Sequence, residues 1–370
     1  METCASCADV VPRPILTCFE CSARNAEAIS PAYCSTRCRS DHRDIHLRHC
    51  NQKDVLRGMY RAGDLLQSAF YLWRRVAFDM NVKSIEKVND ILVLHDDITR
   101  VADGQTIFFK FPASMVPDAV DQKKLLSFLA CTDGIGYMYE LARRLLSDYA
   151  LVVEELGLED PRLENKLKRY YTTGGCFPND VSHAVLAVEH RNGESYIIDL
   201  SCAQFGYYEP VTPFNQYFHG RAGIIKDVNA HGCIMVLHKQ AAFGAGLLAM
   251  QHFGTGGDLR INKAYRELYK IFNSTVDSWE GEHEIPVADI LRCEGESFAR
   301  YQQSLLSRIE SEMKRWISEW EDKGCPMPIL KNSEKKLTLE EQEMLPPYAP
   351  VKKASKDHYS KAIRDIFVAE

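Results

Sequence analysis

The spacing of hydrophobic positions distinguishes helical from extended segments along most of the chain. Apolar residues that recur every three or four positions, as one face of a helix requires, occupy residues 53–79, 123–131, 135–156 and 296–322. The last segment has the longest apolar stripe, from Phe298 to Trp320, and its opposite face is charged. We therefore predict four helices and expect the stripe of the last one to cover the core of a domain.

Between these helices, other segments have the composition of strands. Residues 90–111 predict a hairpin with an Asp-Gly pair at its turn. Residues 183–200 predict a second hairpin, and its Asn-Gly pair suits a type I′ turn because both central residues then need positive φ. Residues 232–238 are a further strand-like stretch. These patterns predict an α+β domain with antiparallel hairpins and long helices.

The first 50 residues differ from the rest of the chain. They contain few large apolar side chains but seven of the 13 cysteines. A spacer of two residues lets a tight turn aim two thiolates inward, and a spacer of three places two ligands on one face of a helical turn. Eight such ligands predict two tetrahedral Zn²⁺ sites, and the metal would supply the stability that so small a core cannot. The ligands form four pairs: Cys4-x2-Cys7, Cys18-x2-Cys21, Cys34-x3-Cys38 and His46-x3-Cys50.

Disulfide bonds are the alternative explanation for so many cysteines. The first 30 residues show no basic segment followed by an apolar one, so we see no secretory signal. We accordingly expect an intracellular protein of the nucleus or cytoplasm, where disulfides are rare. The spacing favours metal ligands, but it leaves open whether each zinc is held by consecutive or by interleaved pairs.

The stretch from Tyr33 to Cys50, preceded by two Cys-x2-Cys pairs, resembles a MYND-type zinc finger. The resemblance implies that the pairs interleave and that the finger recognises a protein partner, typically a proline-containing peptide. The chain departs from the family pattern at residues 41–43, where Asp-His-Arg stands in place of a common aromatic residue. Carried over to this sequence, one zinc would be held by Cys4, Cys7, Cys34 and Cys38, and the other by Cys18, Cys21, His46 and Cys50.

Charge and hydropathy exclude several classes of function. The formal net charge is −6, from 45 basic and 51 acidic residues, so we do not expect broad electrostatic binding to nucleic acid. The chain has no run of 18 apolar residues, and we expect no membrane association. The last forty residues, 331–370, are rich in charge and proline, and we expect a mobile tail there.

A second group of residues suggests thiol chemistry. His183 opens one strand of the predicted hairpin and Asp199 closes the other, so the two side chains should lie close together. This order, with Cys131 ahead of a helix upstream, resembles the Cys, His and Asp positions of transglutaminase-like or papain-like folds. The resemblance implies a nucleophilic thiol, for which Cys176 is a competing candidate. The structural alternative is a buried Cys131, with His183 and Asp199 satisfying each other's hydrogen bonds.

The sequence as a whole predicts three parts: a finger over residues 1–50, an α+β domain over 51–330 and the tail over 331–370. We expect a zinc-binding protein that recognises a short peptide of a partner through its finger, rather than an enzyme. The alternative hypothesis is a Cys-His-Asp thiol hydrolase or acyltransferase that uses Cys131, His183 and Asp199, or a degenerate scaffold version of that fold.

Overall fold

The computed structural model describes most of the 370-residue chain. The described residues are 3–11, 16–17, 31–47, 54–97, 105–159, 166–172, 174–175, 182–191, 193–221, 224–245 and 259–345. Cys18, Cys21, Cys50 and Cys176 lie outside these ranges, and of residues 43–47 and 54–55 only the backbone is described.

A five-stranded antiparallel sheet forms the centre of the molecule, with the strand order β10-β5-β7-β8-β9. Strand β7 lies in the middle and pairs with β5 on one side and β8 on the other. The predicted hairpin over residues 183–200 is thus confirmed, as β7 and β8. The strands are β5 (Ala150–Glu159), β7 (Ser182–His190), β8 (Ser195–Ile198), β9 (Val211–Pro213) and β10 (Ile224–Ala230).

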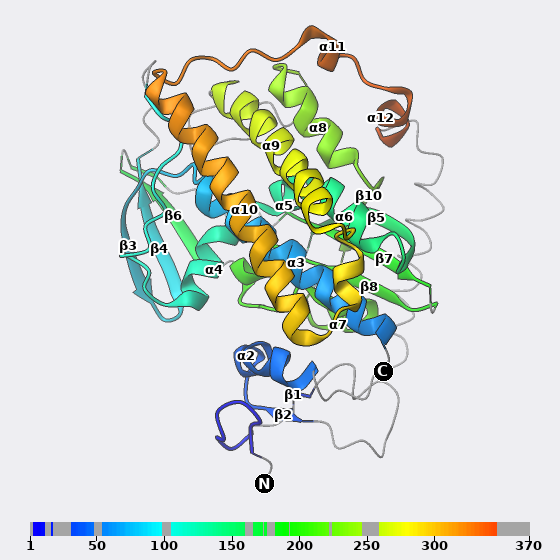
Figure 1. Ribbon diagram of the computed structural model, residues 1–370. Coiled ribbons are helices and arrows are strands. Elements are labelled where there is room, and N and C mark those ends of the chain that lie inside the picture. The colour runs from blue at the N-terminus through cyan, green and yellow to red at the C-terminus, as the bar shows by residue number, and fades with distance from the viewer. Residues whose placement is uncertain are drawn as a thin grey trace.

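Two smaller sheets flank this centre. One has the order β3-β4-β6, in which β4 pairs with β6 in parallel, and it lies on the left of Figure 1. The other is a two-stranded ribbon near the N-terminus, at the bottom of the same view. The strands are β3 (Val82–Val88), β4 (Ile91–Asp96), β6 (Leu167–Tyr171), β1 (Leu16–Thr17) and β2 (Ala32–Tyr33).

Long helices lie toward the viewer in Figure 1, where α10 packs against both α9 and α3, and α3 contacts the central sheet at β9. The predicted helices over residues 53–79 and 296–322 are confirmed as α3 and α10. The helices are α2 (Thr36–Leu47), α3 (Asp54–Val76), α4 (Ala119–Ser127), α5 (Cys131–Tyr137), α6 (Tyr139–Leu146), α7 (Phe214–Gly220), α8 (Cys233–Ala242), α9 (Leu259–His283), α10 (Gly295–Asp322), α11 (Asn332–Lys335) and α12 (Leu339–Met344). Among the helices of the described ranges, none has both the length and the apolar character needed to cross a bilayer.

The main core lies between the central sheet and these helices, and α3 runs through it. Phe70 and Trp73 on α3 are completely buried. The Trp73 indole stacks on the Tyr137 ring of α5 at 4.6 Å between centroids and also contacts Phe272 of α9. The stacking of Trp73 on Tyr137 therefore fixes the short helix α5 against α3.

Three of the predicted elements are wrong in their pairing or extent. The helix predicted over residues 123–131 forms as α4, which begins at Ala119 and ends at Ser127. Strand β4 forms within the predicted hairpin over residues 90–111, but its partner is the preceding strand β3. The turn between them uses Asn89 and Asp90, which both have positive φ, so a two-residue turn forms ahead of the predicted Asp-Gly pair. Residues 105–111 contain no strand, and their Ile107 and Phe108 side chains enter the core.

The helix predicted over residues 135–156 is also wrong in its last part. It is divided into α5, α6 and the start of β5. Residues 150–156 contain β-branched side chains that suit a strand, and pairing with both β7 and β10 outweighs the helical spacing.

The strand predicted over residues 232–238 is a helix, α8. Gly232 precedes it with φ of 99°. Both oxygens of the buried Glu155 carboxylate accept backbone N–H groups at this end of α8, from Gly232 at 2.6 Å and from Ile234 at 2.8 Å. A distant side chain therefore caps the helix, and no local pattern reveals such a cap.

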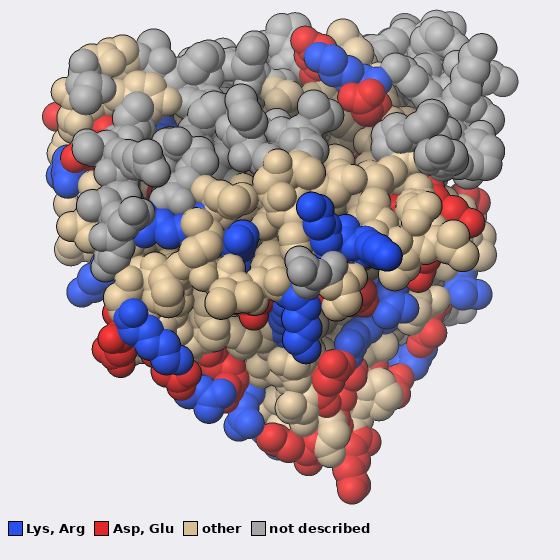
Figure 2. Space-filling view, turned by 90° about the horizontal axis from the view of Figure 1, so that it is seen from above, with Lys and Arg blue, Asp and Glu red and all other residues tan. Residues whose placement is uncertain are grey.

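Charged side chains occur both on the surface and inside the protein. On the face shown in Figure 2, the described Lys and Arg residues are interspersed with Asp and Glu. Inside the protein, the Arg74 guanidinium lies 3.3 Å from carboxylate oxygens of both Asp79 and Asp133. Burial lowers the pKa of Arg74, but its neighbours Asp79, Tyr265 and Asp133 together outweigh this effect and raise the pKa. This cluster joins α3 to α5.

Replacing Arg74 by leucine should lower the free energy of unfolding by about 3–5 kcal/mol, because two buried carboxylates then lose their counter-ion. Arg75→Leu is the matched control, since its guanidinium bonds Gln122 at the surface, and it should cost less than about 1 kcal/mol. Chemical denaturation of both variants measures the difference. Equal free energies of unfolding in the two variants would show that the buried ion pairs of Arg74 add no more stability than the surface bond of Arg75.

Candidate metal centre and a cysteine–histidine–aspartate cluster

Two local turns position the four cysteines of the N-terminal cluster. Cys4 and Cys7 lie in a turn closed by bonds from the Cys4 N–H to the Asp9 carbonyl and from the Ala8 N–H to the Cys4 carbonyl. Cys34 follows β2, and Cys38 lies in the first turn of α2. The Ser35 hydroxyl accepts the Cys38 N–H at 3.1 Å, as expected of a residue at a helix N-terminus.

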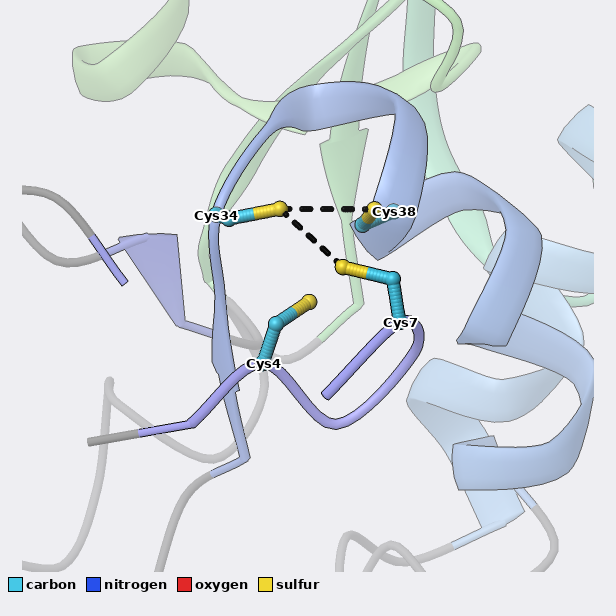
Figure 3. A group of neighbouring side chains, drawn as sticks. All are labelled: Cys4, Cys7, Cys34 and Cys38. Carbon is cyan, nitrogen blue, oxygen red and sulfur yellow. Dashed lines mark hydrogen bonds between the residues drawn. The ribbon is translucent and has the colours of Figure 1, made fainter. Parts of the chain in front are cut away.

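The four sulfur atoms lie within 4.8 Å of one another. The Cys7 and Cys38 sulfurs each lie 3.5 Å from that of Cys34, and Figure 3 marks both contacts with dashed lines. These thiols are free, and the separations are far longer than a disulfide bond of about 2 Å. A tetrahedral zinc with Zn–S bonds of about 2.3 Å places its sulfurs about 3.8 Å apart, so the cluster has the size of such a site.

The ionisation of these thiols also fits a cation. Burial raises the pKa of Cys4, but backbone N–H groups, first that of Cys7, outweigh this effect and lower it to about 6. The pKa of Cys7 is raised, since the neighbouring Cys34 thiol and Asp9 carboxylate outweigh a lowering backbone bond from Asp9. The ionisation of each thiol is therefore coupled to that of its neighbours, and a divalent cation among them would favour the thiolate forms.

The cluster combines the first and third cysteine pairs of the sequence. This is the interleaved arrangement that the MYND resemblance implies, and not the alternative of consecutive pairs. The second set of ligands cannot be placed in the same way. Cys18, Cys21 and Cys50 lie outside the described residues, and the side chain of His46 is not described.

The central sheet brings together the second group of sequence candidates. His183 lies on β7 and Asp199 directly follows β8, so the pairing of these strands places them side by side. The His183 Nε2 and Asp199 Oδ2 atoms are 2.9 Å apart, and each residue is only 2% exposed. The Tyr217 hydroxyl donates to Asp199 Oδ2 at 2.9 Å, and the Ser201 N–H donates to Oδ1 at 3.2 Å.

Cys131 is the first residue of α5, which packs against β7. Cys131 and His183 line the same cleft, and the Cys131 residue is partly exposed. Because His183 uses Nε2 toward Asp199, its Nδ1 atom is the nitrogen left to exchange a proton with a thiol. That Nδ1 atom is buried and has no hydrogen-bond partner.

The environment of His183 favours its protonated form. Burial lowers its pKa, but the Asp199 charge and hydrogen bond, with a smaller contribution from Cys131, raise the value to about 10. An imidazolium at neutral pH would stabilise a thiolate beside it, which is the state in which cysteine acts as a nucleophile.

A cleft of about 190 Å³ opens at Cys131 and His183. Its walls come from α5, β5, β7, β10 and the start of α8, and they include Glu155, Asp227 and Asn229. Burial raises the pKa of Glu155 to about 8, against the backbone N–H groups of Ile234 and Gly232 that lower it. The lining within the described residues contains no Lys or Arg, so the cleft suits neutral or positively charged ligands.

The sequence did not reveal every residue of this cluster. Tyr217 lies on the short helix α7, far from any motif, and its bond to Asp199 becomes visible only in the fold. Cys176, the competing nucleophile candidate, lies outside the described residues.

Comparisons of the chain with protein-family models, with curated proteins and with solved structures found no match. The function is therefore argued from the geometry of the two clusters.

Proposed function

We propose that the N-terminal module is a zinc-binding recognition module, and that its four-thiol cluster is one of two structural zinc sites. The observation that carries this proposal is the convergence of Cys4, Cys7, Cys34 and Cys38 to the dimensions of a tetrahedral site. Four protein thiolates leave no open coordination position, which suits a structural and not a catalytic ion. Recognition of a protein partner, with a proline-containing peptide as the ligand, is the role that the MYND resemblance supports.

The small core of the module supports a structural role for the metal. Among the described residues of this region, the buried apolar cluster consists of Cys4, Val11, Ala32 and Tyr33. Such a core is too small to sustain a fold alone, so metal binding and folding of the module should be linked.

Purified protein should contain two zinc ions per chain, and Cys34→Ser should contain one, because the described site then lacks a ligand. Elemental analysis measures both values. Cys293→Ser is the matched control, since that cysteine lies before α10, outside the module, and it should keep both ions. A single zinc ion per chain in the unaltered protein would contradict the second site. An unchanged zinc content in Cys34→Ser would contradict the site at Cys4, Cys7, Cys34 and Cys38.

A second function is supported by a separate observation: Cys131 and His183 line one cleft, and Asp199 bonds the His183 ring from behind it. We propose that this cluster performs acyl transfer. The Cys131 thiolate would attack an acyl carbonyl carbon, and the His183 imidazolium would donate its proton to the departing amine or alcohol as the bond to it breaks. The neutral His183 would then take a proton from water or from another acyl acceptor. The deprotonated acceptor would attack the thioester carbonyl and release the Cys131 thiolate.

The two proposals concern different modules, so they can hold together. The Asp199 carboxylate would orient His183 and stabilise its protonated form, as the carboxylate does in other triads. Tyr217 and the Ser201 N–H would in turn hold Asp199 in place.

Cys131 should react with iodoacetamide at pH 6 faster than any other cysteine outside the metal sites, because the protonated His183 stabilises a thiolate. His183→Ala should remove this preference while leaving the protein folded. Mass spectrometry of the labelled peptides measures each rate. Partly exposed Cys293 is the internal control, and equal labelling of Cys131 and Cys293 would contradict a nucleophilic role.

The His183–Asp199 pair also predicts a pH dependence of stability. Since the pKa of His183 is raised to about 10, its stabilising contribution is fully present below pH ~6.5 and is lost as the pH rises through ~10. Asp199→Asn should lower the free energy of unfolding at pH 7 by about 1–3 kcal/mol and weaken this dependence. Denaturation series between pH 6 and 10 measure both effects. Asp227→Asn, in the same cleft but exposed, should leave both unchanged.

A further inference from the structure

Helix α2 of the N-terminal module is docked onto the α+β body through an ion pair beside the metal cluster. Arg39 directly follows the cluster residue Cys38. Its guanidinium donates to both oxygens of Glu209, with an Nε–Oε1 distance of 2.6 Å. The side chains of Arg39 and Glu209 are each only 7% exposed. A buried, two-pronged pair of this kind fixes the relative position of the segments that carry it.

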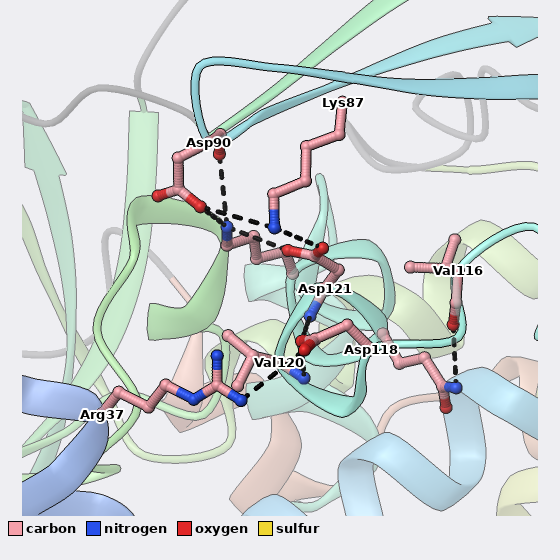
Figure 4. A network of polar contacts seen from close by, with 9 residues as sticks. Arg37, Lys87, Asp90, Val116, Asp118, Val120 and Asp121 are labelled. Atoms are coloured by element: carbon pink, nitrogen blue, oxygen red, sulfur yellow. Dashed lines mark hydrogen bonds and ion pairs between the residues drawn. The ribbon is translucent and has the colours of Figure 1, made fainter.

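The same helix makes a second and weaker contact with the body. The Arg37 guanidinium lies 3.6 Å from Asp118, the residue that caps α4. Figure 4 shows Arg37 extending from α2 toward this end of α4. Both side chains are well exposed, so the contact contributes little, but it offers a control on the same helix.

The segment held by Arg39 is also the segment that fixes the backbone of Asp199. The residue after Glu209 is Pro210, whose carbonyl accepts the Asp199 N–H at 2.7 Å. The next residue begins β9 and pairs with Ile198, the last residue of β8. A displacement of residues 209–211 would therefore move Asp199 relative to His183.

Metal binding should determine where Arg39 lies. Cys38 is in the first turn of α2, and a bound ion would tie it to Cys4, Cys7 and Cys34. Without that link, the described part of the module would hold α2 through its small apolar core, and the body would hold it through the pairs of Arg37 and Arg39. If α2 moved, the buried Glu209 carboxylate would lose its counter-ion, and its segment would have to move toward water.

We propose that Arg39 is a positioning residue that couples metal binding at Cys4, Cys7, Cys34 and Cys38 to the Cys131–His183–Asp199 cluster. The coupling passes from α2 through the Arg39–Glu209 pair to residues 209–211, and from there to Asp199. Loss of the metal would then weaken the bond between Asp199 and His183. The consequence for Cys131 reactivity rests on the proposed acyl-transfer function, whereas the effect on His183 does not.

The test compares Arg39→Gln with Arg37→Gln, each with and without removal of metal by a chelator. Titration of His183 by NMR is the main measurement, and iodoacetamide labelling of Cys131 at pH 6 is the second. Arg39→Gln should retain its zinc and lower the pKa of His183 by about one unit. Labelling at pH 6 should slow only as far as the loosened His183 ring moves away from the thiol, because the ring stays protonated at that pH. Arg37→Gln should match the unaltered protein in all of these, and Arg39→Lys, which keeps the charge, should recover part of the loss.

Chelation provides the decisive comparison. In the unaltered protein it should reproduce the effect of Arg39→Gln, and added Zn²⁺ should reverse it. In Arg39→Gln it should add little, because two changes on one path are not additive. The double variant Arg39→Gln/Glu209→Gln leaves no buried charge unpaired, so it keeps the test valid if the single variant unfolds.

Two outcomes would overturn the coupling. One is an unchanged His183 titration in Arg39→Gln, and the other is an equal effect of chelation with and without Arg39. A Cys131 that is unreactive in the unaltered protein would instead contradict the acyl-transfer function. The His183 titration would still decide whether the coupling exists.

Discussion

The antiparallel pairing of β7 with β5 and β8 is the constraint on which the rest of the structure depends. It places His183 beside Asp199 at the end of β8 and provides the surface on which α5 presents Cys131. A shift of β7 by one residue would turn His183 to the other face of the sheet, because side chains alternate along a strand. The long helices then cover the sheet and bury its main core.

Buried charges occur where separate segments of the protein meet. Arg74 joins α3 to α5, Arg39 joins α2 to the segment before β9, and His183 meets Asp199 between two strands. Burying an ion pair costs about as much free energy as the pair returns, so such pairs add little net stability. Breaking one is expensive, however, because an unpaired charge remains. Pairs of this kind therefore serve chiefly to fix the geometry of the segments that they join.

The N-terminal module and the body depend on different sources of stability. The body has a large apolar core around Phe70 and Trp73. The module has a core of four residues among those described, together with four converging thiols. A structural metal is the means by which small modules usually compensate for a small core. If Arg39 transmits the position of α2 to Asp199, the state of the small module would affect chemistry in the large one.

Local spacing was enough to predict several features of this protein. The periodic apolar stripes predicted α3 and α10, because tertiary packing buries the same face that an isolated amphipathic helix would present. The Cys4-x2-Cys7 and Cys34-x3-Cys38 pairs predicted thiols that could hold a metal ion together, since each pair is formed by a single turn. The sequence also indicated Cys131, His183 and Asp199, because a hairpin brings the last two together at short range.

Only the tertiary structure decided how these pieces combine. Residues 150–156 have helical spacing yet form a strand, since β5 finds partners on both sides. Residues 233–242 form a helix whose first turn is capped by Glu155 from a distant strand. Cysteine spacing could not distinguish interleaved from consecutive pairs, and neither Tyr217 nor the Arg39–Glu209 pair lies within a motif. The physical reason is the same in each case, because these contacts join residues far apart in the chain, and their free energy depends on burial that only the assembled fold creates.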